Sequence, residues 1–150
     1  MATATPPWFN YYGNVPHTLE YPRVTMYEAV MRTVERCPDA VAYDFFGTGA
    51  TYRDFADAID RCAGALVGMG LKPGDRMTIA MPTCPQAIIC FYAVNKLGGV
   101  ASMIHPLSTS TEIEFYLNLS RSRFALTLDA FYGKFKEIQS RSGLERLVLA

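Results

Sequence analysis

The fold is decided by residues 77–128, whose sequence is MTIAMPTCPQAIICFYAVNKLGGVASMIHPLSTSTEIEFYLNLSRSRFALTL. Three short apolar runs in it have the composition of buried strands: Met77–Met81, Val100–Ile104 and Phe124–Leu128. The segments between them have helical patterns, and such alternation indicates a parallel sheet with right-handed crossovers. Strands that are apolar throughout are typical of a sheet covered on both faces. The sequence therefore predicts an α/β fold with a doubly wound, largely parallel sheet flanked by helices.

Two helices are expected to pack their apolar stripes on this sheet, Tyr52–Met69 and Pro85–Leu97. The first has apolar residues at helical spacing and stops at Gly70, which can adopt the left-handed conformation of a C-cap. Gly64 and Gly68 within it are interpreted as positions of close helix packing. The expected stripe comprises Phe55, Ile59, Cys62, Leu66 and Met69.

Capping patterns mark two helix starts, at Thr51–Asp54 and at Thr109–Glu112. A further helix is expected from Thr25 to the residue before Pro38, with Met26, Ala29, Val30 and Val34 on one stripe. The remaining expected elements are a strand at Val41–Phe46, a hairpin-like turn at Gly47–Gly49, a helix carrying Ile113, Tyr116, Leu117 and Leu119, a helix at Ala130–Gln139 and a strand beginning at Leu147–Leu149.

The first two dozen residues differ from the rest of the chain. They are rich in Pro, Tyr and Asn, and the prolines oppose regular secondary structure. We expect residues 1–24 to form an extended arm whose aromatic side chains, Trp8, Tyr11 and Tyr12, need a surface to lie on. The predicted organisation is this arm followed by one α/β unit over residues 25–150.

Composition excludes several classes of protein. Hydrophobic residues make up 50% of the 150 residues, which rules out wholesale disorder. The chain has 14 Lys plus Arg and 14 Asp plus Glu, so it lacks the positive charge of a nucleic-acid-binding protein. No apolar run approaches the roughly 20 residues of a transmembrane helix. The N-terminus lacks the features of a secretion signal, so we expect a cytoplasmic location.

Motifs for chemistry are not found in the sequence. There is no Walker loop, no nucleophile elbow and no pair of cysteines at metal-binding spacing. His105 follows an expected strand, at the end of the sheet where α/β proteins place ligands. The favoured interpretation is a turn histidine bonded to a backbone carbonyl ahead of Pro106. Arg121 and Arg123 are interpreted as a solvated turn. We therefore assign no catalytic, cofactor-binding or metal-binding residue.

The order of the segments resembles the acyl-adenylate-forming enzymes, which include acyl-CoA synthetases, peptide-synthetase adenylation domains and luciferases. The similarity lies in TYRDF (51–55), AGALVGMGLKPGDRMTIAMPTCPQ (63–86) and YAVNKLGGVASMIHPLSTSTEIEFYLN (92–118). The arm and PDAVAYDFFG (38–47) are similar to the start of long-chain fatty-acid–CoA ligases. Each motif is weak by itself, but together and in order they are specific.

The resemblance implies the first part of the large N-terminal domain of such an enzyme, with an incomplete sheet. ATP, Mg²⁺, CoA and a fatty acid or other carboxylate are implied for the full-length enzyme, whose phosphate loop and lysines lie outside these residues. The chain stops at Leu147–Ala150 within a strand-like run, so we expect a piece of a longer protein. The remainder of the synthetase is expected to cover an exposed apolar face near that end.

Two alternatives are kept. A member of the same superfamily that activates an aryl or amino acid has a similar scaffold, and Thr83 and His105 stand where many members have Asn. A free-standing α/β binding module without catalysis is the second alternative. The arm, with its likeness to fatty-acid ligases, favours a fatty-acid–CoA ligase over the first alternative. The apolar ending at Leu147–Ala150 disfavours the second, which would have polar sheet edges and a capped C-terminus.

Overall fold

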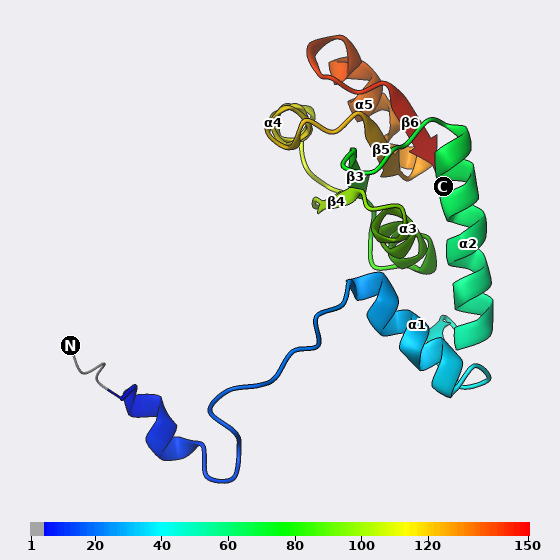
Figure 1. Cartoon of the computed structure of the whole chain (residues 1–150). Coiled ribbons are helices and arrows are strands. Elements are labelled where there is room, and N and C mark those ends of the chain that lie inside the picture. The colour runs from blue at the N-terminus through cyan, green and yellow to red at the C-terminus, as the bar shows by residue number, and fades with distance from the viewer. Residues whose placement is uncertain (1–4) are drawn as a thin grey trace.

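The computed structural model describes residues 5–150 and contains a four-stranded parallel sheet of order β4-β3-β5-β6 (Figure 1). Its strands are β3 (Arg76–Ala80), β4 (Val100–Met103), β5 (Phe124–Thr127) and β6 (Arg146–Leu149). In the register, Met77 of β3 pairs with Ala101 of β4 on one side and with Phe124 of β5 on the other. The predicted parallel sheet is confirmed, with each strand within about a residue or two of its expected bounds.

Helices cover both faces of this sheet, and a small antiparallel hairpin precedes it. The helices are η1 (Pro7–Tyr11), α1 (Met26–Arg36), α2 (Tyr52–Gly68), α3 (Pro85–Lys96), α4 (Ser110–Ser120), η2 (Asp129–Phe131), α5 (Tyr132–Ile138) and η3 (Gln139–Arg141), and the hairpin strands are β1 (Val41–Phe45) and β2 (Thr48–Thr51). The helix expected over residues 130–139 is therefore divided into η2, α5 and the start of η3. The expected hairpin is found, but its turn lies at Phe46 and Gly47, both at positive φ, because Thr48 and Gly49 of the expected turn belong to β2.

Capping boxes begin the three helices α1, α2 and α4. At α2, Thr51 Oγ1 accepts a hydrogen bond from Asp54 N at 3.1 Å, and Asp54 Oδ2 accepts one from Thr51 N at 2.9 Å. Thr109 and Glu112 make the same pair of bonds at α4, as their spacing predicts. Each box satisfies backbone N–H groups that have no partner within the helix.

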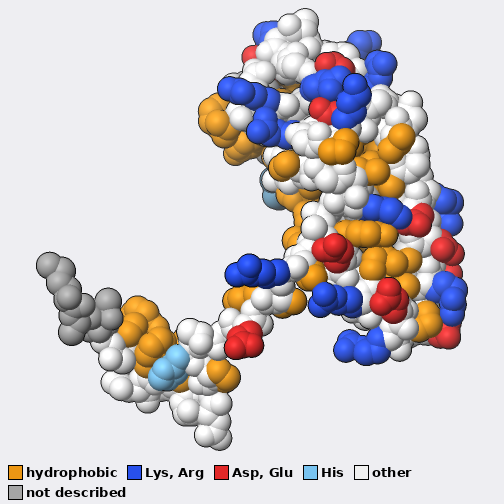
Figure 2. All heavy atoms as spheres, in the orientation of Figure 1, with side chains coloured by type: hydrophobic (Ala, Val, Ile, Leu, Met, Phe, Trp, Pro, Cys, Tyr) orange, Lys and Arg blue, Asp and Glu red, His pale blue; other side chains and the backbone are white. Residues whose placement is uncertain are grey.

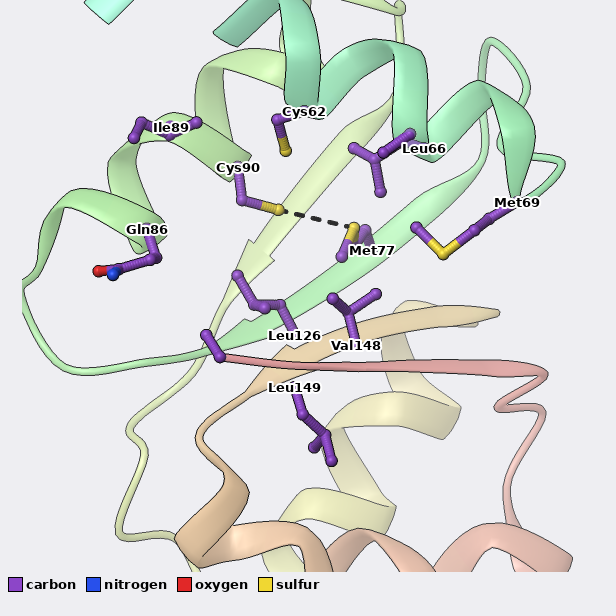
Figure 3. A pocket seen from close by; sticks show the side chains of 12 residues that line it. Cys62, Leu66, Met69, Met77, Gln86, Ile89, Cys90, Leu126, Val148 and Leu149 are labelled. Carbon is purple, nitrogen blue, oxygen red and sulfur yellow. Dashed lines mark hydrogen bonds between the residues drawn. The ribbon is translucent and has the colours of Figure 1, made fainter. Parts of the chain in front are cut away.

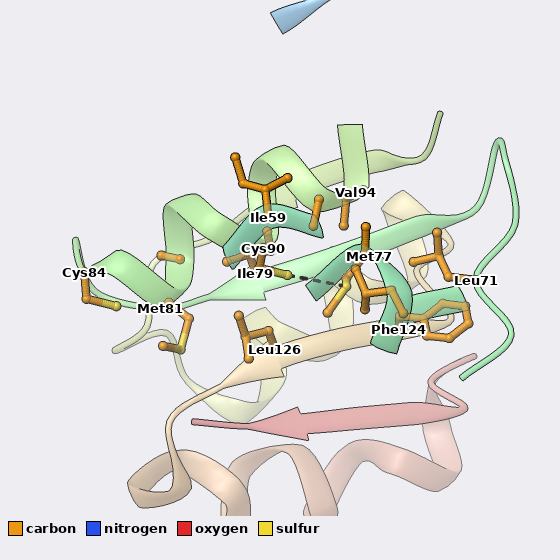
Figure 4. Close-up of a cluster of buried hydrophobic side chains, with 14 of the residues drawn as sticks. Ile59, Leu71, Met77, Ile79, Met81, Cys84, Cys90, Val94, Phe124 and Leu126 are labelled. Carbon is orange, nitrogen blue, oxygen red and sulfur yellow. Dashed lines mark hydrogen bonds between the residues drawn. The ribbon is translucent and has the colours of Figure 1, made fainter. Parts of the chain in front are cut away.

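The core is divided between the two faces of the sheet. Met77, Ile79, Phe124 and Leu126 point from β3 and β5 into the larger cluster, which α2 and α3 cover (Figure 4). The alternate residues of the same strands face α4 and α5, in a smaller cluster that includes Ala80, Ala125, Ile113, Leu117, Phe135 and Ile138. Both faces of the central strands are therefore buried, as the continuous apolar runs predict.

Two glycines illustrate different requirements of the backbone. Gly70 ends α2 in the left-handed region, at φ +94°, as expected. Gly99 lies where α3 turns into β4, and a Cβ atom there would lie 2.9 Å from Val94 Cγ1 and 3.2 Å from the Asp75 carbonyl oxygen. The prediction of close packing at Gly64 and Gly68 is wrong, because a Cβ at either position would meet nothing within 4 Å.

The face of α1 that is buried differs from the one predicted by its apolar stripe. Val30 of the expected stripe packs against the larger cluster, but Met26 is 54% exposed and Ala29 is exposed, and Tyr27, which was not expected there, packs on the cluster instead. The Tyr27 backbone N–H donates to Asn95 Oδ1 at 2.9 Å, which fixes the start of α1 against α3. This tertiary contact sets the rotation of the helix, so the choice of buried face could not be made from spacing alone.

The described part of the arm, residues 5–24, extends away from the rest of the molecule (Figure 1). Its one helical element is η1, which starts at Pro7, because proline has a backbone φ suited to a first helical position. Phe9 and His17 stack with ring centroids 4.0 Å apart, while Trp8 and Tyr11 are largely exposed. Figure 2 shows hydrophobic side chains on the surface of the arm. Residues 1–4 of the predicted arm lie outside the described residues. No helix within residues 5–150 has the length and apolar character needed to cross a membrane.

Candidate functional site

The sheet has a topological switch point between β3 and β5. From β3 the chain passes through α3 to β4 on one side, and then returns through α4 to β5 on the other side of β3. The crossovers on the two sides leave opposite faces of the sheet, so a crevice forms at the carboxyl ends of the strands. The segments that follow β3, β4 and β5 meet there.

A pocket of about 550 Å³ occupies this position. Its walls come from the residues immediately after the three strands, namely Met81, Pro82, Thr83, Ile104, His105, Pro106, Leu107, Leu128 and Phe131. His105 thus lies at the switch point, as its place after an expected strand indicates. Leu128 and Phe131 were not singled out from the sequence, although applying the same rule to the strand Phe124–Leu128 would have found them.

His105 is exposed, and its hydrogen bond differs from the expected one. The imidazole Nδ1 accepts from the Leu107 backbone N–H at 3.2 Å, so the ring does not donate to a carbonyl through this nitrogen. Pro106 has no N–H, and the turn brings the next amide to the ring. Because Nδ1 is the acceptor, the neutral ring carries its proton on Nε2. His105 can therefore present an N–H donor.

The loop after β4 is fixed by contacts with α4 and α5. Lys134 Nζ donates to the carbonyl oxygens of Leu107 at 3.3 Å and Ser108 at 2.8 Å, and it lies 5.2 Å from the centroid of the Phe131 ring. Hydrogen bonds from the Thr109 backbone and side chain lower the pKa of Glu112 at the start of α4. These contacts hold one wall of the crevice in place.

The chemistry of the crevice is mainly apolar. Its lining supplies one imidazole and one hydroxyl, from His105 and Thr83, and it includes no Lys, Arg, Asp or Glu side chain. Across residues 5–150 there is no cluster of three or more His, Cys, Asp or Glu side chains that could hold a metal ion. Mg²⁺ bound with nucleotide phosphates requires carboxylate oxygens and cationic partners. The donor set of the crevice does not fit a magnesium–nucleotide site.

The interpretation of Arg123 as part of a solvated turn is wrong. Its guanidinium binds Glu145 through two hydrogen bonds of 2.8 Å and contacts Asp75 Oδ1 at 3.1 Å. The hydrogen bonds from Arg123 lower the pKa of Glu145. Arg121 lies exposed at the C-cap of α4 in the left-handed conformation. Arg123 therefore ties the starts of β3, β5 and β6 together, at the opposite end of the strands from the crevice.

Comparison with known proteins identifies the family. A family profile described as "AMP-binding enzyme" matches residues 30–149. The chain belongs to the AMP-binding enzyme family. A long-chain-fatty-acid–CoA ligase of Bacillus subtilis is 31% identical over 144 residues, covering 95% of this chain and 26% of that ligase. A 4-coumarate–CoA ligase of Vanilla planifolia is 26% identical over 95 residues, covering 63% of this chain and 17% of that protein.

Solved structures of this family share the fold. The crystal structure of a long-chain-fatty-acid–CoA ligase from Archaeoglobus fulgidus matches with a TM-score of 0.81 at 18% identity, covering 89% of this chain and 28% of that one. The α/β fold with its parallel sheet is thus the fold of this family. The chain spans about a quarter of the length of these relatives.

Proposed function

We propose that this chain forms the first part of the large domain of an ATP-dependent fatty-acid–CoA ligase. The observation that carries the proposal is the 31% identity to the long-chain-fatty-acid–CoA ligase of Bacillus subtilis, which extends over 95% of this chain. Most of the arm is included in that span, since only 5% of the chain lies outside it, and the likeness of the arm to fatty-acid ligases favours a fatty acid over an aryl or amino acid as the substrate.

In the proposed reaction, ATP first activates the carboxylate as an acyl-adenylate with release of pyrophosphate. The CoA thiol then displaces AMP to give the thioester. Charge develops on phosphate oxygens, so Mg²⁺, a lysine and loop amides must be aimed at them. We assign those groups to the part of the enzyme beyond this segment, because the crevice here carries no such groups.

The proposed contribution of this chain is a rigid wall at the switch point. Lys134 fixes the loop after β4, and the buried sheet fixes the starts of the loops after β3 and β5. The apolar side chains of Met81, Ile104 and Leu128 exclude water from one side of the crevice. His105 Nε2–H provides a hydrogen-bond donor there.

A chimera tests the proposal. Residues 1–149 of this chain, with the arm included, replace the aligned N-terminal segment of the Bacillus subtilis ligase, and carboxylate-dependent AMP release is measured with palmitate, 4-coumarate and an amino acid. We expect activity with palmitate and little with the other two acids. The unmodified ligase is the positive control. A folded chimera that prefers 4-coumarate would support the aryl-acid alternative, and one that activates no acid would overturn the proposal.

The isolated chain provides a second test. We expect carboxylate-dependent exchange of pyrophosphate into ATP to stay at background. We also expect self-association or binding of the dye ANS, because apolar side chains line a pocket beside β6 and the aromatic side chains of Trp8 and Tyr11 are exposed on the arm. A monomer that unfolds cooperatively and ignores the dye would favour the free-standing binding module.

A further inference from the structure

A second pocket, of about 220 Å³, lies on the face of the sheet covered by α2 and α3 (Figure 3). Apolar side chains such as Leu66, Leu126 and Val148 make up most of its walls. The thiols of Cys62 and Cys90 also line it, one from α2 and the other from α3. None of its lining residues is shared with the crevice at the carboxyl ends of the strands.

The two thiols face one another across the contact between α2 and α3. Figure 3 shows both sulfur atoms directed into the same space, and both residues line the one pocket between α2 and α3. Cys90 is 3% exposed and its Sγ lies 3.8 Å from Met77 Sδ, whereas Cys62 is only half-buried. Both are free thiols.

The environments of these thiols give them different reactivity. A hydrogen bond from Cys90 lowers the pKa of Cys62, since it stabilises the Cys62 thiolate. The hydrogen bond with Cys62, together with burial, raises the pKa of Cys90. The thiolate is the nucleophilic form of cysteine, so Cys62 is the more reactive member of the pair. A partly accessible thiol with a lowered pKa, placed beside a second thiol, is the arrangement of redox-reactive cysteines.

We propose that Cys62 and Cys90 form a peroxide-reactive pair that closes to a disulfide between α2 and α3. The Cys62 thiolate attacks a hydroperoxide, so that an S–O bond forms, the O–O bond breaks and the leaving oxygen takes a proton. The Cys90 sulfur then attacks the Cys62 sulfenic acid. The S–S bond forms, the S–O bond breaks, and the hydroxide combines with the Cys90 proton as water. Two thiols are oxidised and one hydroperoxide is reduced.

The pocket supplies the access that this chemistry needs. Its volume of about 220 Å³ is several times the roughly 30 Å³ that one water molecule occupies in the liquid, so a small hydroperoxide fits. The other two cysteines are placed differently, since Cys37 Sγ donates to the Thr33 carbonyl at 3.4 Å and Cys84 is buried at the N-cap of α3. The disulfide would join the two helices that cover the larger cluster, and so restrain their separation.

Oxidation of the purified, reduced chain with a small excess of hydrogen peroxide tests the proposal. We expect the intact mass to fall by that of two hydrogen atoms, two thiols to become resistant to alkylation, and peptide mapping to identify a Cys62–Cys90 link that dithiothreitol removes. The thermal midpoint of the oxidised chain is expected to rise, because the link restrains the unfolded state.

Serine variants provide the matched controls. We expect C62S and C90S each to lose the link, while the double variant C37S/C84S keeps it. Even where C62S or C90S folds poorly, peptide mapping of the wild-type chain and of C37S/C84S shows whether the Cys62–Cys90 disulfide forms. Four alkylatable thiols after oxidation, Cys62 over-oxidised without a link, or a link to Cys37 or Cys84 would each overturn the proposal.

Discussion

The two faces of the central strands are buried by different means. On the side of α2 and α3, β3 and β5 present large side chains, and Met77, Ile79 and Phe124 are almost completely inaccessible. On the side of α4 and α5, the same strands present Thr78 and Thr127, together with the small residues Ala80 and Ala125. Adjacent residues of one strand therefore meet very different surroundings.

Hydrogen bonds make burial of the second face possible. Thr78 Oγ1 donates to Ser122 Oγ at 2.9 Å, and Thr127 Oγ1 donates to the Ala80 carbonyl oxygen at 3.2 Å. A buried hydroxyl without a partner would be costly. The first face is thus stabilised mainly by the volume and area that its side chains bury, and the second also depends on the pairing of particular polar groups.

The largest effect on stability is expected from shortening a buried side chain on the face covered by α2 and α3. Phe124→Ala removes a ring that is 1% exposed within the larger cluster, and we expect it to lower the free energy of unfolding by about 3–5 kcal/mol. Urea unfolding followed by circular dichroism measures the change. The control is Phe115→Ala on α4, where the ring is 59% exposed and the expected change is within about 0.5 kcal/mol. Similar losses in the two variants would contradict the packing of this cluster.

A pair of glycine substitutions compares a crowded position, Gly99 at the turn between α3 and β4, with an open one, Gly64 in α2. Gly99→Ala would place a methyl group 2.9 Å from Val94 Cγ1, and we expect it to destabilise the protein by about 1–3 kcal/mol. Gly64→Ala lies in open space within α2, so it should stabilise the protein by about 0.5–1 kcal/mol. The two midpoints of thermal unfolding should move in opposite directions. A loss of stability in both would restore the interpretation of Gly64 as a packing position.

The second face is tested by removing one hydroxyl. Thr78→Val keeps the shape of the side chain, and we expect it to cost about 1 kcal/mol because Ser122 loses one partner but keeps the Ser120 hydroxyl at 2.8 Å. In a double-mutant cycle with Ser122→Ala, the combined loss should be smaller than the sum of the single losses. Additive losses, measured by urea unfolding, would show that the two hydroxyls do not stabilise one another.

Local signals predict much of this fold, and contacts between distant residues account for what was missed. The strand at Met77–Met81 was found because burial on both faces requires an apolar run, and the capping box at Thr109–Glu112 involves only neighbouring residues. Arg123 was misinterpreted because its partners, Asp75 and Glu145, are 48 and 22 positions away.

At the candidate site, too, local features of the sequence could be predicted and contacts set by the fold could not. The place of His105 at the carboxyl end of a strand could be predicted from the sequence, although the sequence offered no reason to assign it a role. Its bond to Leu107 N depends on the geometry of the turn at Pro106. The pairing of Cys62 with Cys90 depends on how α2 packs on α3, and helical spacing within either segment gives no information about it.

The smallest effect on stability is expected at the capping boxes of α2 and α4, which lie on opposite faces of the sheet. The Thr51 side chain and backbone lower the pKa of Asp54, and the Thr109 backbone and side chain lower that of Glu112. A carboxyl whose pKa is lower in the folded state stabilises the protein above its unfolded pKa, about 3.9 for Asp and 4.3 for Glu. This contribution is lost as the pH falls through the folded value.

We therefore expect Asp54→Asn and Glu112→Gln each to be slightly less stable than wild type at pH 7, and the difference to vanish in acid. Hydrogen exchange should assign the change to α2 in the first variant and to α4 in the second. Asp57→Asn, which removes the same charge from α2 outside the cap, is the control. A difference that persists unchanged at low pH would mean that the amide disturbs the cap for reasons other than its charge.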